Sequence, residues 1–273
     1  MVEEFRLSRR RACRAVGLSR AAWYRPPVEA RVRDAMVIDA LNGLVAQHSR
    51  WGFWKCYDRL RLDGYRWNHK KLWRVYRALG LHLPRRSKRR VPERIRQPLV
   101  APVAVNQVWA VDFMHDALYG GRRFRTLNVL DEGNREGLTI EVGTSIPAAR
   151  VVRVLDQLTT IYGRPDALRL DNGPEITSAL FTEWCAVRGI GLKYIQPGHP
   201  AQNAFIERFN RTYREEVLDA YLFESVAEVQ GLSDEWLRIY NERRPHEALG
   251  SVPPVLFRPR AVPGRESMTP VST

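Results

Sequence analysis

Cysteine is scarce in this sequence. The three cysteines, Cys13, Cys56 and Cys185, lie far apart, form no CxxC pair and have no histidine near them at the spacing of zinc ligands. A disulfide framework or a structural zinc site is therefore not expected. Long apolar runs are also missing, and the first residues, MVEEFRLSRRR, lack the apolar core of a signal peptide. We expect no membrane span and a cytoplasmic protein.

Positive charge, by contrast, is abundant and unevenly placed. The net charge is +14, and residues 1–100 hold 25 Lys and Arg against 8 Asp and Glu, whereas residues 101–273 hold 19 against 22. The N-terminal segment is thus basic and the rest of the chain slightly acidic. This indicates that the N-terminal segment binds a polyanion and that the following part carries metal-dependent chemistry. A solvated, arginine-rich surface is the alternative, but the size of the excess in one segment favours nucleic acid.

Residues 1–30 predict a fragment that resembles a helix-turn-helix. The segment SRRRACRAVGLSRAAWYR places Gly17 between two short helical stretches, with Ser19 as N-cap of the second. Such short patterns also arise by chance, so the pattern leaves open whether this fragment contacts DNA.

Residues 31–83 predict three helices. The first has an apolar stripe, the second covers residues 55–62, and the third begins after Asn68 as N-cap and ends at Gly80. One face of the third helix carries the basic residues Lys70, Lys71, Arg74 and Arg77. The pattern is typical of a DNA-reading unit, although an ordinary three-helix bundle with a solvated basic face also fits it.

Residues 84–100, PRRSKRRVPERIRQPLV, predict an extended basic linker. Seven basic residues stand against one acidic residue, and three prolines interrupt any helix. Such a segment is suited to lie along a phosphate backbone; a tether that merely stays soluble is the alternative.

From residue 101 the pattern changes to strands and helices in alternation. Three strands are predicted first, then a helix opened by Pro147, a strand, a helix, a strand and a long helix, AFIERFNRTYREEVLDAYL. This order describes an α/β domain over residues 101–222, with a mixed five-stranded sheet and helices on both faces. Residues 223–273 predict a C-terminal helical block and an irregular tail.

Three acidic residues stand out by their positions. Asp112 lies within the apolar strand VWAVDF, Asp171 ends the strand ALRLD, and Glu207 lies in the first turns of the long helix. An acidic group within an apolar strand is costly to bury unless it is paired or bound to a metal. Three carboxylates brought together would repel one another unless divalent cations lay between them. Oxygen ligands of this kind select Mg²⁺ or Mn²⁺ over zinc.

The helical spacing places Glu207 beside the buried stripe of its helix. Asn210, Arg211 and Arg214 share that face, which suits a DNA backbone leading into a metal site. From periodicity alone, a surface ion pair between Glu207 and Arg211 explains the glutamate equally well.

The arrangement of these motifs resembles the D,D(35)E core of insertion-sequence transposases and retroviral integrases. Asp171 and Glu207 are separated by 35 residues, and VDF, DNGPE and QNAFIERFNRT follow in the order of that family. The similarity is greatest to the orfB-type transposases of two-frame insertion sequences. It extends to HSRWGFWKCYDRLRLDGYRWNHKKLWRVYRALGL before the core and to WLRIYNERRPHEALG after it, and so covers roughly residues 45–258.

The resemblance implies an RNase H-like fold in which Asp112, Asp171 and Glu207 are the catalytic residues and the ligands of two Mg²⁺ or Mn²⁺ ions. It also implies a mobile loop of residues 197–203 over the site. The polar residues that would line the DNA path there are Gln202, Asn203, Asn210, Arg211 and Arg214.

Four other acidic residues compete for the role of metal ligand, namely Asp116, Asp131, Glu132 and Glu175. We interpret Glu175 as a neighbour that tunes the site. Asp131 and Glu132 are expected to end a strand at a turn.

The resemblance further implies a transposase that performs 3′-end cleavage and strand transfer by two-metal phosphoryl transfer. The alternatives are an RNase H-like nuclease without strand joining and a catalytically decayed DNA-binding protein. The implied partners are the transposon ends, target DNA, further copies of the chain in a homo-oligomer, and an upstream-frame protein or fusion. Such an enzyme would be bacterial and nucleoid-associated.

Overall fold

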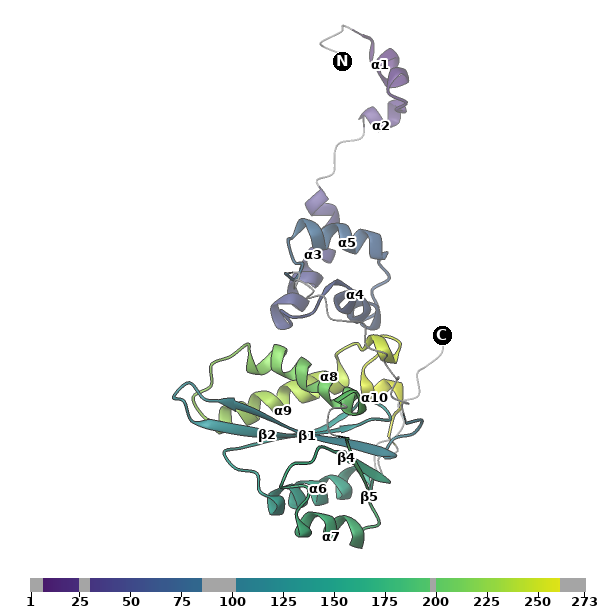
Figure 1. The fold of residues 1–273 in the computed structure, drawn as a ribbon. Coiled ribbons are helices and arrows are strands. Elements are labelled where there is room, and N and C mark those ends of the chain that lie inside the picture. Colours follow the sequence, from purple (N-terminus) through teal and green to yellow (C-terminus); the bar gives the residue numbers. More distant parts are fainter. Residues whose placement is uncertain (1–6, 25–29, 85–101, 197–199, 261–273) are drawn as a thin grey trace. The chain divides into compact units, whose positions relative to one another are not determined.

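The computed structural model describes residues 7–24, 30–84, 102–196 and 200–260 (Figure 1). Contacts divide the chain into two compact units. One consists of Met1–Ser49 with Trp67–His82, and the other of Arg50–Arg66 with Leu83–Thr273. The predicted linker lies outside the described residues from residue 85 onward, as do residues 197–199 of the predicted loop. No helix in the described ranges combines the length and the apolar character that crossing a membrane requires.

The first unit is helical, and two of its helices begin at the predicted caps. Ser19 accepts a hydrogen bond from the backbone N–H of Ala22 at 3.1 Å, and Asn68 accepts one from Lys70 N–H at 2.8 Å. Gly80, in the left-handed region with a φ of 68°, follows the last helix. The helices of this unit are α1 (Arg9–Ala15), α2 (Arg20–Tyr24), α3 (Ala30–Gln47) and α5 (His69–Ala78).

Helices α3 and α5 pack together through apolar stripes at helical spacing. Val37 and Leu41 of α3 and Leu72 and Val75 of α5 are all buried. Helix α4 (Phe53–Leu62) groups with the second unit, whereas the sequence pattern joined it to α3 and α5.

The second unit contains a mixed sheet with the strand order β3-β2-β1-β4-β5. Strand β1 pairs antiparallel with β2, and β2 pairs antiparallel with β3. Strands β1 and β4, and then β4 and β5, are parallel. The predicted RNase H-like mixed five-stranded sheet is therefore confirmed. Its strands are β1 (Val108–Ala117), β2 (Arg123–Asp131), β3 (Gly137–Gly143), β4 (Ala167–Leu170) and β5 (Gly191–Tyr194).

Helices cover both faces of this sheet, with α6 and α7 on one face and α8 and α9 on the other (Figure 1). Side chains alternate along a strand, so β1 supplies both cores. Trp109 and Val111 lie in the cluster with α6 and α7, and Ala110 lies in the cluster with α8 and α9. The helices are α6 (Ala148–Tyr162), α7 (Ala179–Val187), α8 (Ala204–Tyr213) and α9 (Val226–Glu242).

The long helix predicted from Ala204 to Leu222 is shorter than expected. Helix α8 ends at Tyr213 and continues as a π-helical turn, η2 (Arg214–Leu218), and the chain is not helical again until α9. A periodic apolar pattern predicts helix but does not distinguish a π-turn from an α-turn. Short turns of helix, η1 (Pro200–Asn203), η3 (Glu247–Leu249) and α10 (Pro254–Phe257), complete the unit.

Helix α9 belongs to the core of the sheet unit. It packs against β3, and its Trp236 and Tyr240 share one buried cluster with Phe209 of α8. This packing holds α8, and with it Glu207, against the sheet.

Candidate active site

Asp112 lies in the middle of β1 and is half-buried on the face that α8 covers. Each of its carboxylate oxygens accepts one hydrogen bond. Oδ1 accepts from the backbone N–H of Phe113 at 2.9 Å, and Oδ2 accepts from the side-chain amide of Asn210 at 2.8 Å. Both donors are neutral, so the negative charge of Asp112 is oriented but not balanced.

The electrostatics of Asp112 link this residue to the other two predicted carboxylates. Burial is the largest of the causes that raise the pKa of Asp112 to about 6, and the negative charges of Asp171 and Glu207 contribute to the same rise. Strand β1, the end of β4 and helix α8 thus bring together residues that are 59 and 36 positions apart in the sequence.

Asp171 directly follows β4 and opens a tight turn. The backbone N–H of Gly173 donates to Asp171 Oδ1 at 3.1 Å. A Cβ atom at position 173 would lie 3.2 Å from Asp171 Oδ1 and 3.4 Å from Glu175 Oε2. Glycine at this position therefore leaves room for both carboxylates to approach the turn.

Glu207 lies in the first turn of α8 and is half-buried. Its carboxylate is favoured there by the positive, N-terminal end of the helix dipole. Within the described part of the chain no ion pair joins it to Arg211, so the surface pair expected as an alternative is not formed.

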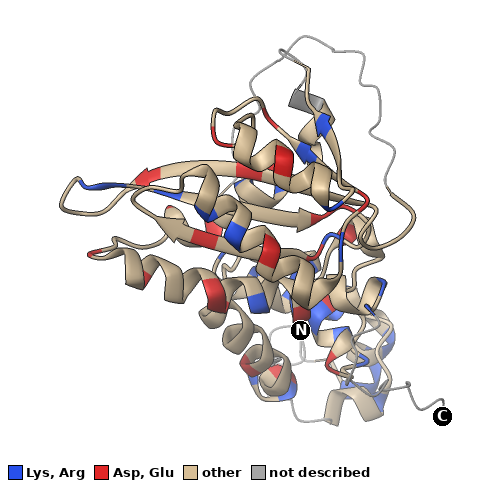
Figure 2. Cartoon of the chain, turned by 90° about the horizontal axis from the view of Figure 1, so that it is seen from below, with Lys and Arg blue, Asp and Glu red and all other residues tan. Residues whose placement is uncertain are grey.

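The four competing carboxylates differ from these three in having arginine partners. Basic residues lie among the acidic ones on the sheet and its helices (Figure 2). The ion pairs join Asp116 to Arg214, Asp131 to Arg260, Glu132 to Arg169, and Glu175 to Arg125. Among the described residues, no arginine or lysine forms an ion pair with Asp112, Asp171 or Glu207. Of the seven candidate carboxylates, the three predicted ligands are therefore those that form no ion pair within the described residues.

The donor chemistry of this group fits a hard divalent cation. Carboxylate oxygens are the ligands that Mg²⁺ and Mn²⁺ prefer, and mutual repulsion is relieved when such an ion binds. Within the described ranges, however, no group of three or more His, Cys, Asp or Glu side chains is arranged to hold a metal ion as it stands. Because two hydrogen bonds hold Asp112, the side chains of Asp171 and Glu207 would have to adjust their positions to share an ion with it.

The three residues of α8 and η2 that were predicted to line the DNA path differ in their exposure and in their partners. Arg211 is exposed, whereas Asn210 is buried and directed at Asp112. Arg214 donates to Asp116 at 2.8 Å and to the carbonyl oxygen of His115 at 2.9 Å. Of these three side chains, the structure leaves Arg211 the most open to a phosphate.

Gln202 and Asn203 precede α8. Gln202 exchanges hydrogen bonds with Gln196, accepting from its backbone N–H at 2.9 Å. Asn203 is buried, and its Oδ1 has no hydrogen-bond partner among the described residues.

The basic residues predicted on α5 belong to the other unit. Lys70, Arg74 and Arg77 are exposed, and Lys71 is half-buried. Arg74 donates to the buried carboxylate of Asp34 at 2.6 Å, and Lys71 lies 3.5 Å from the same group. The Arg74 guanidinium lowers the pKa of Asp34. Lys70 and Arg77 are the residues of this basic face that do not contact Asp34.

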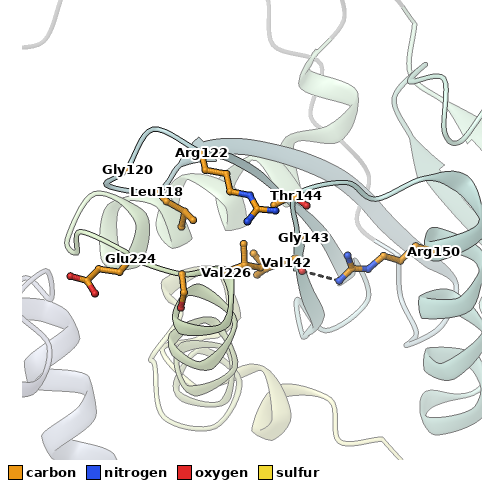
Figure 3. A pocket seen from close by; sticks show the side chains of 10 residues that line it. Leu118, Gly120, Arg122, Val142, Gly143, Thr144, Arg150, Glu224 and Val226 are labelled. Carbon is orange, nitrogen blue, oxygen red and sulfur yellow. Dashed lines mark hydrogen bonds between the residues drawn. The ribbon is translucent and has the colours of Figure 1, made fainter.

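A cavity of about 450 Å³ opens elsewhere on the sheet unit and contains none of the predicted site residues. Arg122, Thr144 and Val226 lie among its lining residues, and Arg150 beside it donates to the carbonyl oxygen of Val142 (Figure 3). The candidate active site is therefore a surface cluster of carboxylates and not this cavity.

Two residues beside the predicted carboxylates were not identified from the sequence. Asn128 of β2 donates to Asn210 at 2.7 Å, and Arg125 of β2 pairs with Glu175 while its guanidinium lies 4.4 Å from the centre of the Phe113 ring. A lone amide inside the apolar segment TLNVL was the available signal for Asn128. No local signal identifies the partner of Arg125.

Comparison with known proteins gives the family context. The Integrase core domain family matches residues 102–200 and 188–254. The insertion element IS476 protein of Xanthomonas euvesicatoria is 41% identical over 94% of this chain and 74% of that protein. The insertion element IS407 protein of Burkholderia multivorans is 38% identical over 93% of this chain and 92% of that protein.

More distant similarity extends to a Mycobacterium tuberculosis protein named as a transposase for insertion sequence element IS986/IS6110. It is 24% identical over 85% of this chain and 90% of its own length. Among solved structures, a chain of the simian T-cell lymphotropic virus intasome in complex with the PP2A regulatory subunit B56 gamma superimposes with a TM-score of 0.49. It shares 17% identity over 85% of this chain and 80% of its own.

Proposed function

The chain belongs to the insertion-sequence transposases that carry an integrase core domain, and from this premise we propose that it cleaves the 3′ ends of its element and joins them to target DNA. Asp112, Asp171 and Glu207 would be the catalytic carboxylates and would hold two Mg²⁺ or Mn²⁺ ions. The ion pairs support this choice, because each of the four competing carboxylates is paired with an arginine, whereas these three have no such pair within the residues that the structure describes.

The proposed chemistry is phosphoryl transfer without a covalent enzyme intermediate. When bound, two divalent ions supply activation of the attacking oxygen and stabilisation of the leaving oxygen. A water oxygen attacks phosphorus at the 3′ end of the element, and the bond to the 3′ oxygen breaks. The freed 3′-hydroxyl then attacks the phosphorus of a target phosphodiester in the same in-line geometry. The element's 3′ oxygen becomes joined to the 5′ phosphate of the target, and the bond from that phosphorus to the target's 3′ oxygen breaks.

The residues of this chain would orient that reaction. Asn210 and the Phe113 N–H hold the two oxygens of Asp112, so its charge points in a fixed direction. Arg211, exposed one helical turn from Glu207, would contact a phosphate of the bound strand. Gln202 and Asn203, next to the start of α8, would contact the terminal nucleotides.

The proposed partners follow from this reaction. Transposon ends and target DNA would contact the sheet unit at the site and the basic face of α5 through Lys70, Lys71, Arg74 and Arg77. Joining two ends at one target requires two sites, so we propose a homo-oligomer in the active complex. An upstream-frame protein or fusion would add end recognition.

A strand-transfer assay tests the proposed reaction. Purified protein is incubated with Mg²⁺, a target duplex, and element ends that are either intact or already cut at the 3′ end. We expect cleavage of the intact ends and joining of the pre-cut ends. Cleavage without any joined product would support the nuclease alternative and contradict the transposase proposal.

Substitution of the site tests its residues. Because ion binding supplies several kcal/mol of transition-state stabilisation, D112N, D171N and E207Q are each expected to lower both reactions about a thousandfold or more. Glu183, exposed on helix α7, offers a matched control, since E183Q makes the same chemical change away from the site. A D171N protein with wild-type cleavage would remove Asp171 from the proposed triad.

A further inference from the structure

Asn128 is a buried amide at the centre of the sheet. Its side chain is 0% exposed, and its neighbours Leu127 and Val129 are equally buried. In the β1–β2 register it lies directly opposite Asp112, and side chains of directly paired residues lie on the same face of a sheet. Asn128 therefore lies beside Asp112, under helix α8.

Two hydrogen bonds connect Asn128 to the carboxylate of Asp112 through one intermediate. Asn128 Nδ2 donates to Asn210 Oδ1 at 2.7 Å, and Asn210 Nδ2 donates to Asp112 Oδ2 at 2.8 Å. An amide side chain has an acceptor end and a donor end. Because Asn128 engages the acceptor end of Asn210, the donor end faces Asp112.

The buried position of Asn128 is not explained by stability. Its own Oδ1 has no hydrogen-bond partner among the described residues, and an unsatisfied buried carbonyl oxygen weakens a fold. An apolar side chain of similar volume would suit the apolar residues of that face better, such as Ile140, which is paired with Asn128 on β3. An amide at this place is instead what the orientation of Asn210 requires.

We propose that Asn128 is a positioning residue that acts through Asn210 to hold the Asp112 carboxylate in the orientation for binding a divalent cation. The proposal rests on the proposed function, in which Asp112 is a metal ligand. Hydrogen-bonding partners of metal ligands commonly set metal affinity in this way.

The polarity of the chain of hydrogen bonds predicts an order among variants. N128L removes the donor to Asn210 and frees its amide to rotate. N128D replaces the donor with an acceptor, so Asn210 must turn its Nδ2 toward position 128 and its oxygen toward Asp112. N128D is therefore expected to disturb the carboxylate more than N128L.

The first measurement is the binding of Mn²⁺ alone by the full chain without DNA. Because an ion that binds the folded state raises the unfolding temperature, titration of that temperature with Mn²⁺ reports affinity. We expect N128L to weaken the apparent Mn²⁺ affinity about tenfold to a hundredfold, and N128D to weaken it further. In chelator, N128L should unfold at the wild-type temperature or above, which a purely structural role would not allow.

Thr126 supplies the matched control. It lies on β2 two residues before Asn128, on the same face of the sheet, is buried, and has no hydrogen-bond partner for its hydroxyl among the described residues. T126V is expected to leave Mn²⁺ affinity and end cleavage unchanged. If N128L fails to fold, N128V makes the same test with a smaller apolar side chain.

The outcomes separate this proposal from the proposed function. If N128L, N128V and N128D retain wild-type Mn²⁺ affinity while D112N loses it, the positioning role of Asn128 is wrong and the metal site stands. If D112N itself binds Mn²⁺ and cleaves DNA as the wild type does, the proposed function fails. Loss of Mn²⁺ affinity in T126V as well would show a general effect of the strand and would overturn the role of Asn128.

Discussion

The sheet unit contains two groups of acidic side chains that differ in their partners. At the turn between β2 and β3, Asp131, Glu132 and Glu136 are buried, yet each forms an ion pair with Arg260 or Arg169. Asp112, Asp171 and Glu207 are only half-buried, and no arginine or lysine of the described chain pairs with them. The more deeply buried group is the compensated one.

This difference distinguishes a structural group from a candidate metal site. A buried carboxylate that is paired and hydrogen-bonded holds elements together, and its removal leaves an uncompensated partner. A carboxylate without a cation destabilises its surroundings and persists where a ligand compensates for it. The partner, and not the depth of burial, separates the acidic residues proposed to serve the reaction from those that hold the fold together.

The largest expected effect compares one glutamate from each group. E207Q should lower end cleavage about a thousandfold or more, because a proposed metal ligand is lost, with little change in stability. E132Q should leave cleavage by the folded protein within about threefold of wild type, because Glu132 is paired with Arg169 and is not a proposed metal ligand. Cleavage rates and urea unfolding measure the two effects. Equal losses of activity in both variants would break the comparison.

The next effect concerns Arg260, which holds both Asp131 and Glu136. R260A is expected to lower the free energy of unfolding by about 3–5 kcal/mol, because two buried carboxylates lose their cation. Arg153 on α6 is exposed, and R153A should change the free energy of unfolding by no more than about 0.5 kcal/mol. A similar small change in R260A would show that the paired group does not stabilise the fold.

The ion pair of Arg125 and Glu175 shares features with both groups. The two residues form an ion pair, and Glu175 lies in the same turn as Asp171. Arg125 lies over the ring of Phe113, the residue that follows Asp112 in the sequence. R125A and E175A are expected to slow cleavage by similar factors, and the double variant should show a coupling of about 1–2 kcal/mol. A double-mutant cycle on cleavage rates measures this. Strict additivity would exclude the pair as a link between β2 and the turn of Asp171.

The smallest effect follows from the unpaired charge of Asp112. Its pKa is about 6 in the folded protein against an ordinary value of 3.8. The unfolded state therefore ionises first, and the fold loses stability as pH rises between these two values. In chelator at pH 8, D112N should therefore raise the free energy of unfolding by about 1–2 kcal/mol. The gain should shrink as pH falls from 6 toward 4. A stabilising effect that persists at pH 4 would not come from this titration.

Much of the fold was predictable because its signals are local. Ser19 and Asn68 cap helices where the sequence placed them, and each of the five strands lies within a segment predicted as strand. The predicted continuation of α8 to Leu222 was wrong, because the π-turn at Arg214–Leu218 has no periodic signature. The placement of α4 with the sheet unit was also not visible in helix periodicity.

The site was predictable in part. The resemblance identified Asp112, Asp171 and Glu207, and in the structure the charges of Asp171 and Glu207 both act on Asp112. Their role as metal ligands remains a prediction. Asn210 was expected along the DNA path, whereas its side chain is buried and bonded to Asp112 and Asn128. Helical spacing predicts the face on which a residue lies but not the group that its side chain meets.

The sequence by itself determined the secondary-structure elements and a set of seven candidate carboxylates, because caps, periodicity and motif spacing act over a few residues. Only the tertiary structure decided which of the seven are compensated. The deciding arginines lie 37 to 129 positions away from their acidic partners, and folding alone brings such distant charges together. Asp112, Asp171 and Glu207 are the three acidic side chains of the set that the fold leaves without such a partner in the described chain.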